Sequence, residues 1–246
     1  MLRSRLVLGL LLLGAMLVAD TATAYILPSD TILRMVVEKR RKLGIVDMTV
    51  QLTTETDGKS APLEERIYIK DPERMRRVRQ EEGGAKVTVQ VEDKAAEGPE
   101  NALKPLKAVP DLLPILLQPS GEELEQVQER LVGVLKRLGI NTAIVTLGRL
   151  GSTIAYVIGG KANEAEKPLL WIDKESFLPL KIVTTQKKDG RSERVEVRWM
   201  EFGSATTGDW FPRILEVWKD GKRVQRSEVT KIEINKKVPD TLFSLP

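Results

Sequence analysis

The closing third of the chain, residues 168–246, constrains the fold more than any other stretch. Apolar and polar residues alternate there in short runs, which are separated by Lys188-Asp189-Gly190, Gly203-Ser204-Ala205 and Lys219-Asp220-Gly221. Alternation with a period of two is typical of half-buried strands, and Asp-Gly between two such runs is typical of a tight hairpin. The stretch is therefore predicted to be an antiparallel meander. It carries no recognisable catalytic motif.

The first half of the chain predicts a helix followed by four strands. Ser29-Asp30 precedes an amphipathic pattern that ends at Gly44, which is typical of a capped helix. Strands are predicted at the alternating segments 45–55, 64–70, 74–80 and 86–92. The basic run at residues 39–42 has two interpretations: a solvated helix face favoured by the helix C-terminus, or a patch for a membrane surface.

The middle of the chain separates two groups of predicted strands. Residues 93–107 are polar and rich in Ala, Glu and Pro, so we expect a long surface loop. Ser120 and Glu123 match a capping box at the start of a helix that ends at Gly139. Strands at 143–150 and 153–159 follow. The total of about ten or eleven strands and two substantial helices predicts an α+β fold, with a sheet large enough to curl or close.

The N-terminus has the organisation of a secretory signal peptide. Arg3 and Arg5 precede an apolar run over residues 6–18, and Ala22-Thr23-Ala24 supplies small residues for cleavage. The run is short for a membrane-spanning helix, so an uncleaved membrane anchor is the less favoured alternative. Residues 1–24 are expected to be removed. The mature protein then begins near Tyr25 and forms one domain over residues 25–246.

Composition excludes several classes of site. The chain has no cysteine and no histidine, which removes disulfides, a lipid-modified cysteine, the usual nucleophile–histidine pairs and most zinc or copper sites. The net charge of +4 is mild and aromatic residues make up only 4%, so nothing indicates a nucleic-acid-binding face. Asp173 and Glu175 fit a turn better than a catalytic pair of carboxylates. We therefore expect no enzyme activity, no metal and no cofactor.

The inner face of the predicted sheet is interpreted either as ordinary core filled by the helices or as a cavity able to take an acyl chain. Periodicity alone favours the filled core. The segment between Pro110 and Pro119 shifts the balance toward a cavity, because it follows a polar loop and is more apolar than a surface turn requires. It is the candidate lid. Its apolar residues are Leu112, Leu113, Ile115, Leu116 and Leu117.

Two motifs in the closing stretch resemble the LolA-type superfamily of periplasmic lipoprotein-localisation proteins. The sequence WIDKESFLPLK at residues 171–181 is similar to that superfamily's pair of strands with W-I-D, a turn and L-P-L-K/R. The ending VPDTLF at residues 238–243 is similar to its closing V-P-D-x-x-F. The order of a signal peptide, a capped helix and two hairpins also agrees. The motifs cover roughly residues 168–246, and the resemblance does not place the functional arginine of the carriers on any particular residue of this sequence.

The resemblance implies a large curled, unclosed antiparallel β-barrel with helices over an apolar cavity. It also implies a monomeric periplasmic carrier that binds lipoprotein acyl chains or a lipid, and that meets inner- and outer-membrane transport proteins on the way to the outer membrane. Other members are envelope-stress sensors that act on an anti-sigma factor, which is the alternative function. Sensors often carry an extra C-terminal domain, and this chain ends at Pro246 after the barrel, which favours the carrier. The expected cavity-lining residues are Trp171, Leu180, Ile182, Val195, Val197, Trp199, Leu215 and Val217.

Overall fold

The computed structural model describes residues 26–58, 61–71, 74–92, 94–106, 123–164, 166–188 and 191–246. Its helices are α2 (Ser29–Arg41), α4 (Leu124–Arg137) and the short 3₁₀ helix η1 (Asp240–Phe243). Its strands are β1 (Asp47–Thr56), β2 (Leu63–Lys70), β3 (Arg74–Glu81), β4 (Gly84–Val91), β5 (Lys94–Pro99), β6 (Lys104–Leu106), β7 (Val145–Leu150), β8 (Thr153–Ile158), β9 (Leu169–Asp173), β10 (Pro179–Lys188), β11 (Arg191–Met200), β12 (Ile214–Lys219) and β13 (Lys222–Ile234).

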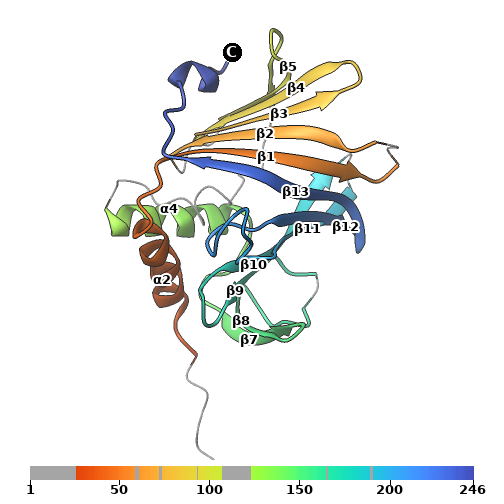
Figure 1. Cartoon of the computed structure of the whole chain (residues 1–246). Helices are drawn as coiled ribbons and strands as arrows, with labels where there is room; N and C mark the ends of the chain where they lie inside the picture. Colours follow the sequence, from red (N-terminus) through yellow and green to blue (C-terminus); the bar gives the residue numbers. More distant parts are fainter. Residues whose placement is uncertain are drawn as a thin grey trace, which may run out of the picture.

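All thirteen described strands form one antiparallel sheet in the order β6-β5-β4-β3-β2-β1-β13-β12-β11-β10-β9-β8-β7. The first and last strands of the chain, β1 and β13, lie side by side near the middle of this order. The sheet curls without closing, because the edge strands β6 and β7 do not pair with each other in the part of the chain that is described (Figure 1). The predicted α+β fold with an unclosed, curled antiparallel sheet is confirmed.

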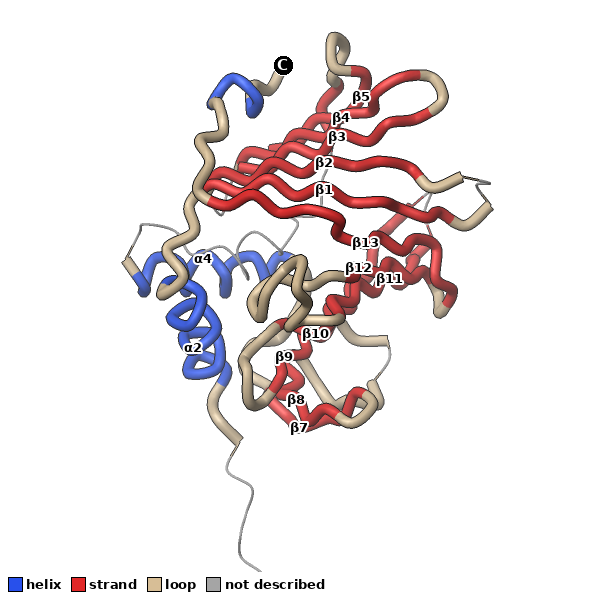
Figure 2. The backbone as a smooth tube through the Cα atoms, in the orientation of Figure 1, coloured by secondary structure: helices blue, strands red, loops and turns tan. Residues whose placement is uncertain are grey.

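Both α-helices cover the same face of the sheet, which we call the inner face (Figure 2). Their apolar residues recur at the three- and four-residue spacing of a helix, so each helix has one stripe to bury. These stripes share a core with inward-facing residues of the strands, such as Met48 and Val50 of β1. The fully or nearly fully buried stripe residues are Ile32, Leu33, Val36 and Val37 of α2, and Val127, Leu131, Val134 and Leu135 of α4.

The predicted hairpin at Lys219-Asp220-Gly221 is confirmed. Lys219 pairs with Lys222, so Asp220 and Gly221 alone make the turn between β12 and β13. Both turn residues have positive φ, 45° and 81°, as the tight hairpin turns that match the twist of the strands require. The second predicted Asp-Gly turn, at 189–190, lies outside the described residues.

The prediction of a surface loop at residues 93–107 is wrong, because this segment contributes strands β5 and β6. Its Ala-, Glu- and Pro-rich composition has a low strand propensity, but pairing with β4 overrides that preference. Ala95 and Ala96 lie on opposite faces of β5, and both are buried, with 6% and 1% of their surfaces exposed. With these two additional strands the described sheet has thirteen strands, whereas ten or eleven were predicted.

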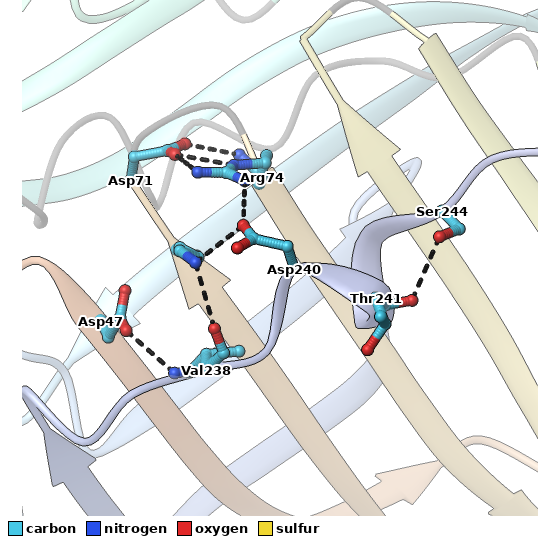
Figure 3. A network of polar contacts seen from close by, with 8 residues as sticks. Asp47, Asp71, Arg74, Val238, Asp240, Thr241 and Ser244 are labelled. Atoms are coloured by element: carbon cyan, nitrogen blue, oxygen red, sulfur yellow. Dashed lines mark hydrogen bonds and ion pairs between the residues drawn. The ribbon is translucent and has the colours of Figure 1, made fainter.

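The C-terminal segment fastens onto the ends of β1 to β3 (Figure 3). The Asp240 carboxylate accepts hydrogen bonds from Lys70 at 2.7 Å and from Arg74 at 2.6 Å, and these donors hold the pKa of the Asp240 carboxyl below its usual range. The backbone N–H of Val238 donates to Asp47 at 2.9 Å. The V-P-D motif therefore has a structural role: it ties the last residues of the chain to the first strands.

The short helix η1 covers part of the sheet face opposite the two α-helices. Phe243 of η1 is only 5% exposed, and η1 contacts β3 and β4. Arg76 of β3 donates to the carbonyl oxygen of Leu242 at 3.1 Å. Val87 and Val89, on the same face of β4 as Arg76, are fully buried. Phe243, the closing Phe of the motif, is thus part of a small core on this face, which we call the outer face.

The predicted signal peptide and the candidate lid at residues 112–117 lie outside the described residues. Among the helices that are described, none combines the length and the apolarity needed to cross a membrane.

Candidate binding cavity

An apolar cavity of about 200 Å³ lies on the inner face of the sheet. Its walls come from β1, β2, β3, β10, β11, β12 and β13, and Leu138, at the C-terminal end of α4, borders it. The strands bring inward-facing side chains together because residues paired across neighbouring antiparallel strands point to the same face. Thus Val197 of β11 lies between Ile182 of β10 and Val217 of β12.

Six of the eight residues that the sequence indicated are grouped around this cavity. They come from three adjacent strands, β10, β11 and β12, where alternate positions share the inner face. They are Ile182, Val195, Val197, Trp199, Leu215 and Val217.

Trp171 and Leu180 do not line the cavity. Both pack on the outer face in a separate cluster with Ala155, Val157 and Val183. Trp171 pairs with Lys181, whereas its neighbour Leu170 pairs with the inward-facing Ile182. The register shifts between Pro179 and Lys181, so Leu180 does not share the inner face with Ile182 as simple alternation predicted.

One side of the cavity is polar, which the sequence analysis missed. We call Thr54, Glu65, Arg79, Gln225 and Ser227 the polar strip; Glu65, Gln225 and Ser227 line the cavity, and Thr54 and Arg79 hydrogen-bond to them from behind. Thr54 Oγ1 and Ser227 Oγ are 2.8 Å apart, and Gln225 Nε2 donates to Ser227 Oγ at 3.1 Å. Arg79 donates from Nη2 to Gln225 Oε1 at 3.3 Å and from Nε to Glu65. The Glu65 side chain is only 1% exposed, so Arg79 compensates a carboxylate that burial alone would disfavour.

Strand phase would have placed one member of this strip, Glu65, on the inner face. Glu65 is two residues before Ile67 and four before Ile69, both of which are inward-facing core residues. The alternation that placed Ile67 on the inner face therefore places Glu65 there too. Glu65 was missed because only apolar residues were considered as candidates for the cavity wall.

The cavity combines an apolar wall with a polar side, an arrangement that suits an amphiphilic ligand. Its apolar wall can bury hydrocarbon, and the polar strip offers donors and acceptors at one side. Asp173 does not contribute to it, because its carboxylate accepts from the backbone N–H groups of Glu175 and Ser176 at 2.8 and 2.6 Å and so stabilises a turn. Within the described ranges, no three acidic side chains gather into a metal-binding group.

Solved structures of other proteins have this arrangement of sheet and helices, at low sequence identity. A LolA superfamily protein from Nitrosomonas europaea is 14% identical with a TM-score of 0.53, over 89% of this chain and 99% of that one. A putative outer membrane lipoprotein-sorting protein domain from Vibrio parahaemolyticus is 10% identical with a TM-score of 0.53, over 88% and 97%. The protein has the LolA-like fold. The fold expected from the two motifs is thereby confirmed.

A third structure extends the same fold to a differently named family. A DUF1329 family protein from Desulfovibrio piger is 11% identical with a TM-score of 0.52, over 89% of this chain and 98% of that one. No protein-family model and no curated protein matches this sequence. The LolA-like fold therefore rests on structure and on the two motifs.

The outer face of this LolA-like sheet is strongly charged over β10 to β13. Glu196 is bonded by Arg194 at 2.7 Å and by Arg198, and Lys181 lies 3.7 Å away. Burial acts to raise the pKa of the Glu196 carboxyl, but the surrounding cations outweigh it and leave the pKa lowered. Burial likewise acts to raise the pKa of the Glu216 carboxyl. Hydrogen bonds from Trp218 and two arginines outweigh that effect and leave the pKa lowered. The Glu196 and Glu216 carboxylates are thus bonded to neighbouring donors on this face, and the apolar cavity lies on the other side.

Proposed function

We propose that the protein is a non-catalytic periplasmic carrier that holds the acyl chain of a lipoprotein or a lipid in this cavity and delivers it towards the outer membrane. The observation that carries the proposal is the pairing of an apolar wall, from six residues of β10, β11 and β12, with the polar strip. The LolA-like fold and the signal-peptide pattern support it.

The dimensions of the cavity indicate how much of a chain it holds. A cavity of about 150 Å³ accommodates benzene, which has six carbons, so about 200 Å³ accommodates roughly eight carbons. Each buried methylene contributes about 0.8 kcal/mol. A longer chain requires the cavity to widen, and α4 is the element to move because its end, at Leu138, borders the cavity. The apolar segment at residues 112–117 precedes α4 and stays the candidate lid.

The polar strip gives the bound chain an orientation. Gln225 and Ser227 belong to both the strip and the cavity wall, so an ester or carboxyl group at the head of the chain can exchange hydrogen bonds with them. The hydrocarbon then runs along Val197 and Trp199. Hydrogen bonding of the head matters because an unpaired polar group in such a site costs about 1–3 kcal/mol.

The proposal is tested by titrating the purified protein with an acylated peptide and with the same peptide lacking its acyl chain. Saturable binding near one chain per protein, seen with the acylated peptide alone, is the expected result. Equal binding of both peptides, or binding of neither together with an organic extract that holds no lipid, would sink the carrier function. Capture of an anti-sigma factor by the protein, undisturbed when the cavity is filled by substitution, would favour the sensor function instead.

A further inference from the structure

Two exposed segments meet at one rim of the sheet, where α2 leads into β1 and where β13 ends. Leu43 and Val46 lie in the first segment, residues 41–46, and Ile234 lies at the start of the second, residues 234–237. Their surfaces are 41%, 51% and 47% exposed. We call these three side chains the apolar rim. Single exposed apolar residues are ordinary on a protein surface, whereas a group of them marks a contact site.

Asn235 fixes the two segments against each other. Its side-chain oxygen accepts from the backbone N–H of Val46 at 2.9 Å, and its amide nitrogen donates to the carbonyl oxygen of Gly44 at 3.0 Å. Its own backbone N–H donates to the carbonyl oxygen of Asp47 at 2.7 Å. Asn235 adopts a φ of 55°, which Asn tolerates better than most residues. The apolar rim is therefore held in place by its backbone.

The basic run at residues 39–42 divides into two parts at this rim. Lys39 donates to the carbonyl oxygens of Glu175 and Ser176 at 3.1 and 3.3 Å, and Arg40 is only 7% exposed. Both are anchors of α2 to the rest of the fold. Arg41 and Lys42 are exposed. These two cationic side chains therefore lie at the surface, next to Leu43 in the sequence.

Positive charge surrounds the apolar rim on both segments. Arg41 and Lys42 flank it on one side, and the exposed Lys236 and Lys237 follow Ile234 on the other. Two acids lie among them: Glu38, 3.3 Å from Lys42, and Glu233, 3.5 Å from Lys236. Four cations and two carboxylates leave these side chains with an excess of positive charge.

We propose that the apolar rim and its basic flanks dock the protein on an anionic membrane surface. The three apolar side chains enter the boundary between lipid headgroups and acyl chains, as apolar side chains of interfacial segments do. The flanking cations attract anionic headgroups, each by about fivefold in affinity near the surface. The surface lies outside the cavity wall, so this inference does not depend on what the cavity binds.

The test compares binding to vesicles of phosphatidylcholine with and without 30% phosphatidylglycerol, by co-sedimentation. Cells express the protein with its own N-terminus, and the soluble form from the periplasmic extract is used for every variant, after its mass shows that all share one N-terminus. The test variant is the triple substitution Leu43→Ser, Val46→Ser and Ile234→Ser. The matched control is Ile154→Ser, which changes an apolar side chain 43% exposed in β8.

The wild-type protein and the control are expected to bind anionic vesicles and to bind phosphatidylcholine at least about tenfold more weakly. The triple variant is expected to lose about tenfold or more in affinity for anionic vesicles while it keeps the circular dichroism spectrum and the urea unfolding midpoint of the wild type. Replacing Arg41, Lys42, Lys236 and Lys237 with Gln is expected to remove the salt dependence. Three results would overturn the proposal: no binding to anionic vesicles, wild-type binding by the triple variant, or an equal loss in the control.

Discussion

Filling the cavity with a larger side chain should abolish ligand binding while leaving the sheet intact. Val197 is in register with Ile182 on one side and Val217 on the other, at the centre of the apolar wall. Tryptophan has about seven more heavy atoms than valine, and on the scale of six carbons in about 150 Å³ these occupy most of the cavity's roughly 200 Å³. The substitution Val197→Trp therefore displaces about seven carbons of a bound chain.

The loss of transfer free energy is about 0.8 kcal/mol per displaced methylene, or about 5–6 kcal/mol in all. The chain and the wall can adjust, so we expect a loss of at least about hundredfold in affinity, equivalent to about 2.7 kcal/mol. Overpacking is expected to change the free energy of unfolding by no more than about 1–3 kcal/mol.

The assay is displacement of a fluorescent fatty acid by an acylated peptide, combined with urea unfolding of each variant. Ile154→Trp, at an exposed position of β8, is the matched control and should bind like the wild type. If Val197→Trp folds and still binds acylated peptide within about threefold of the wild type, the inner face is not the binding site.

Three further outcomes are expected. Phe243→Ala should lower the free energy of unfolding by about 3 kcal/mol in urea, because it empties the small outer core over β3 and β4; a change below about 1 kcal/mol would contradict this role. The folded-state pKa of Glu196 is lowered, so its ionised form stabilises the fold above an unfolded-state pKa of about 4.3 and this contribution is lost as pH falls through the folded-state value. Glu196→Gln should therefore reduce the loss of stability below about pH 4.3, and equal slopes of stability against pH in acid for the two proteins would refute it. Gln225→Leu should weaken fatty-acid binding by about fivefold, or about 1 kcal/mol, relative to an uncharged apolar dye, and equal effects on both probes would remove the polar strip from recognition.

Local chemistry made most of the fold predictable from the sequence. Asp220-Gly221 specified its hairpin because both residues tolerate the positive φ that the turn requires. The amphipathic pattern that predicted α2 agrees with the burial of one stripe of its residues. Gly44 and Gly139, both with positive φ, follow the two helices whose ends they were predicted to mark. Each of these predictions depends on neighbours in sequence.

Features that depend on distant pairing were not predictable in the same way. Lys94–Pro99 forms β5 because β4 offers a free edge, not because its own residues prefer a strand. Leu180 leaves the inner face because the pairing of β10 with β9 slips between Pro179 and Lys181. The inward orientation of Glu65 could have been predicted, because Glu65 is in phase with Ile67. Its burial as a carboxylate depends on a hydrogen bond from Arg79 of the neighbouring strand, which the local sequence does not reveal.

The most direct test of the proposed carrier is mass spectrometry of organic extracts from protein purified without detergent. The expected result is an acylated lipid, near one per protein, in the wild type and in Ile154→Trp, and its loss in Val197→Trp. A clean extract from the wild type, together with no binding of acylated peptide, would contradict the central claim that the inner-face cavity holds an acyl chain.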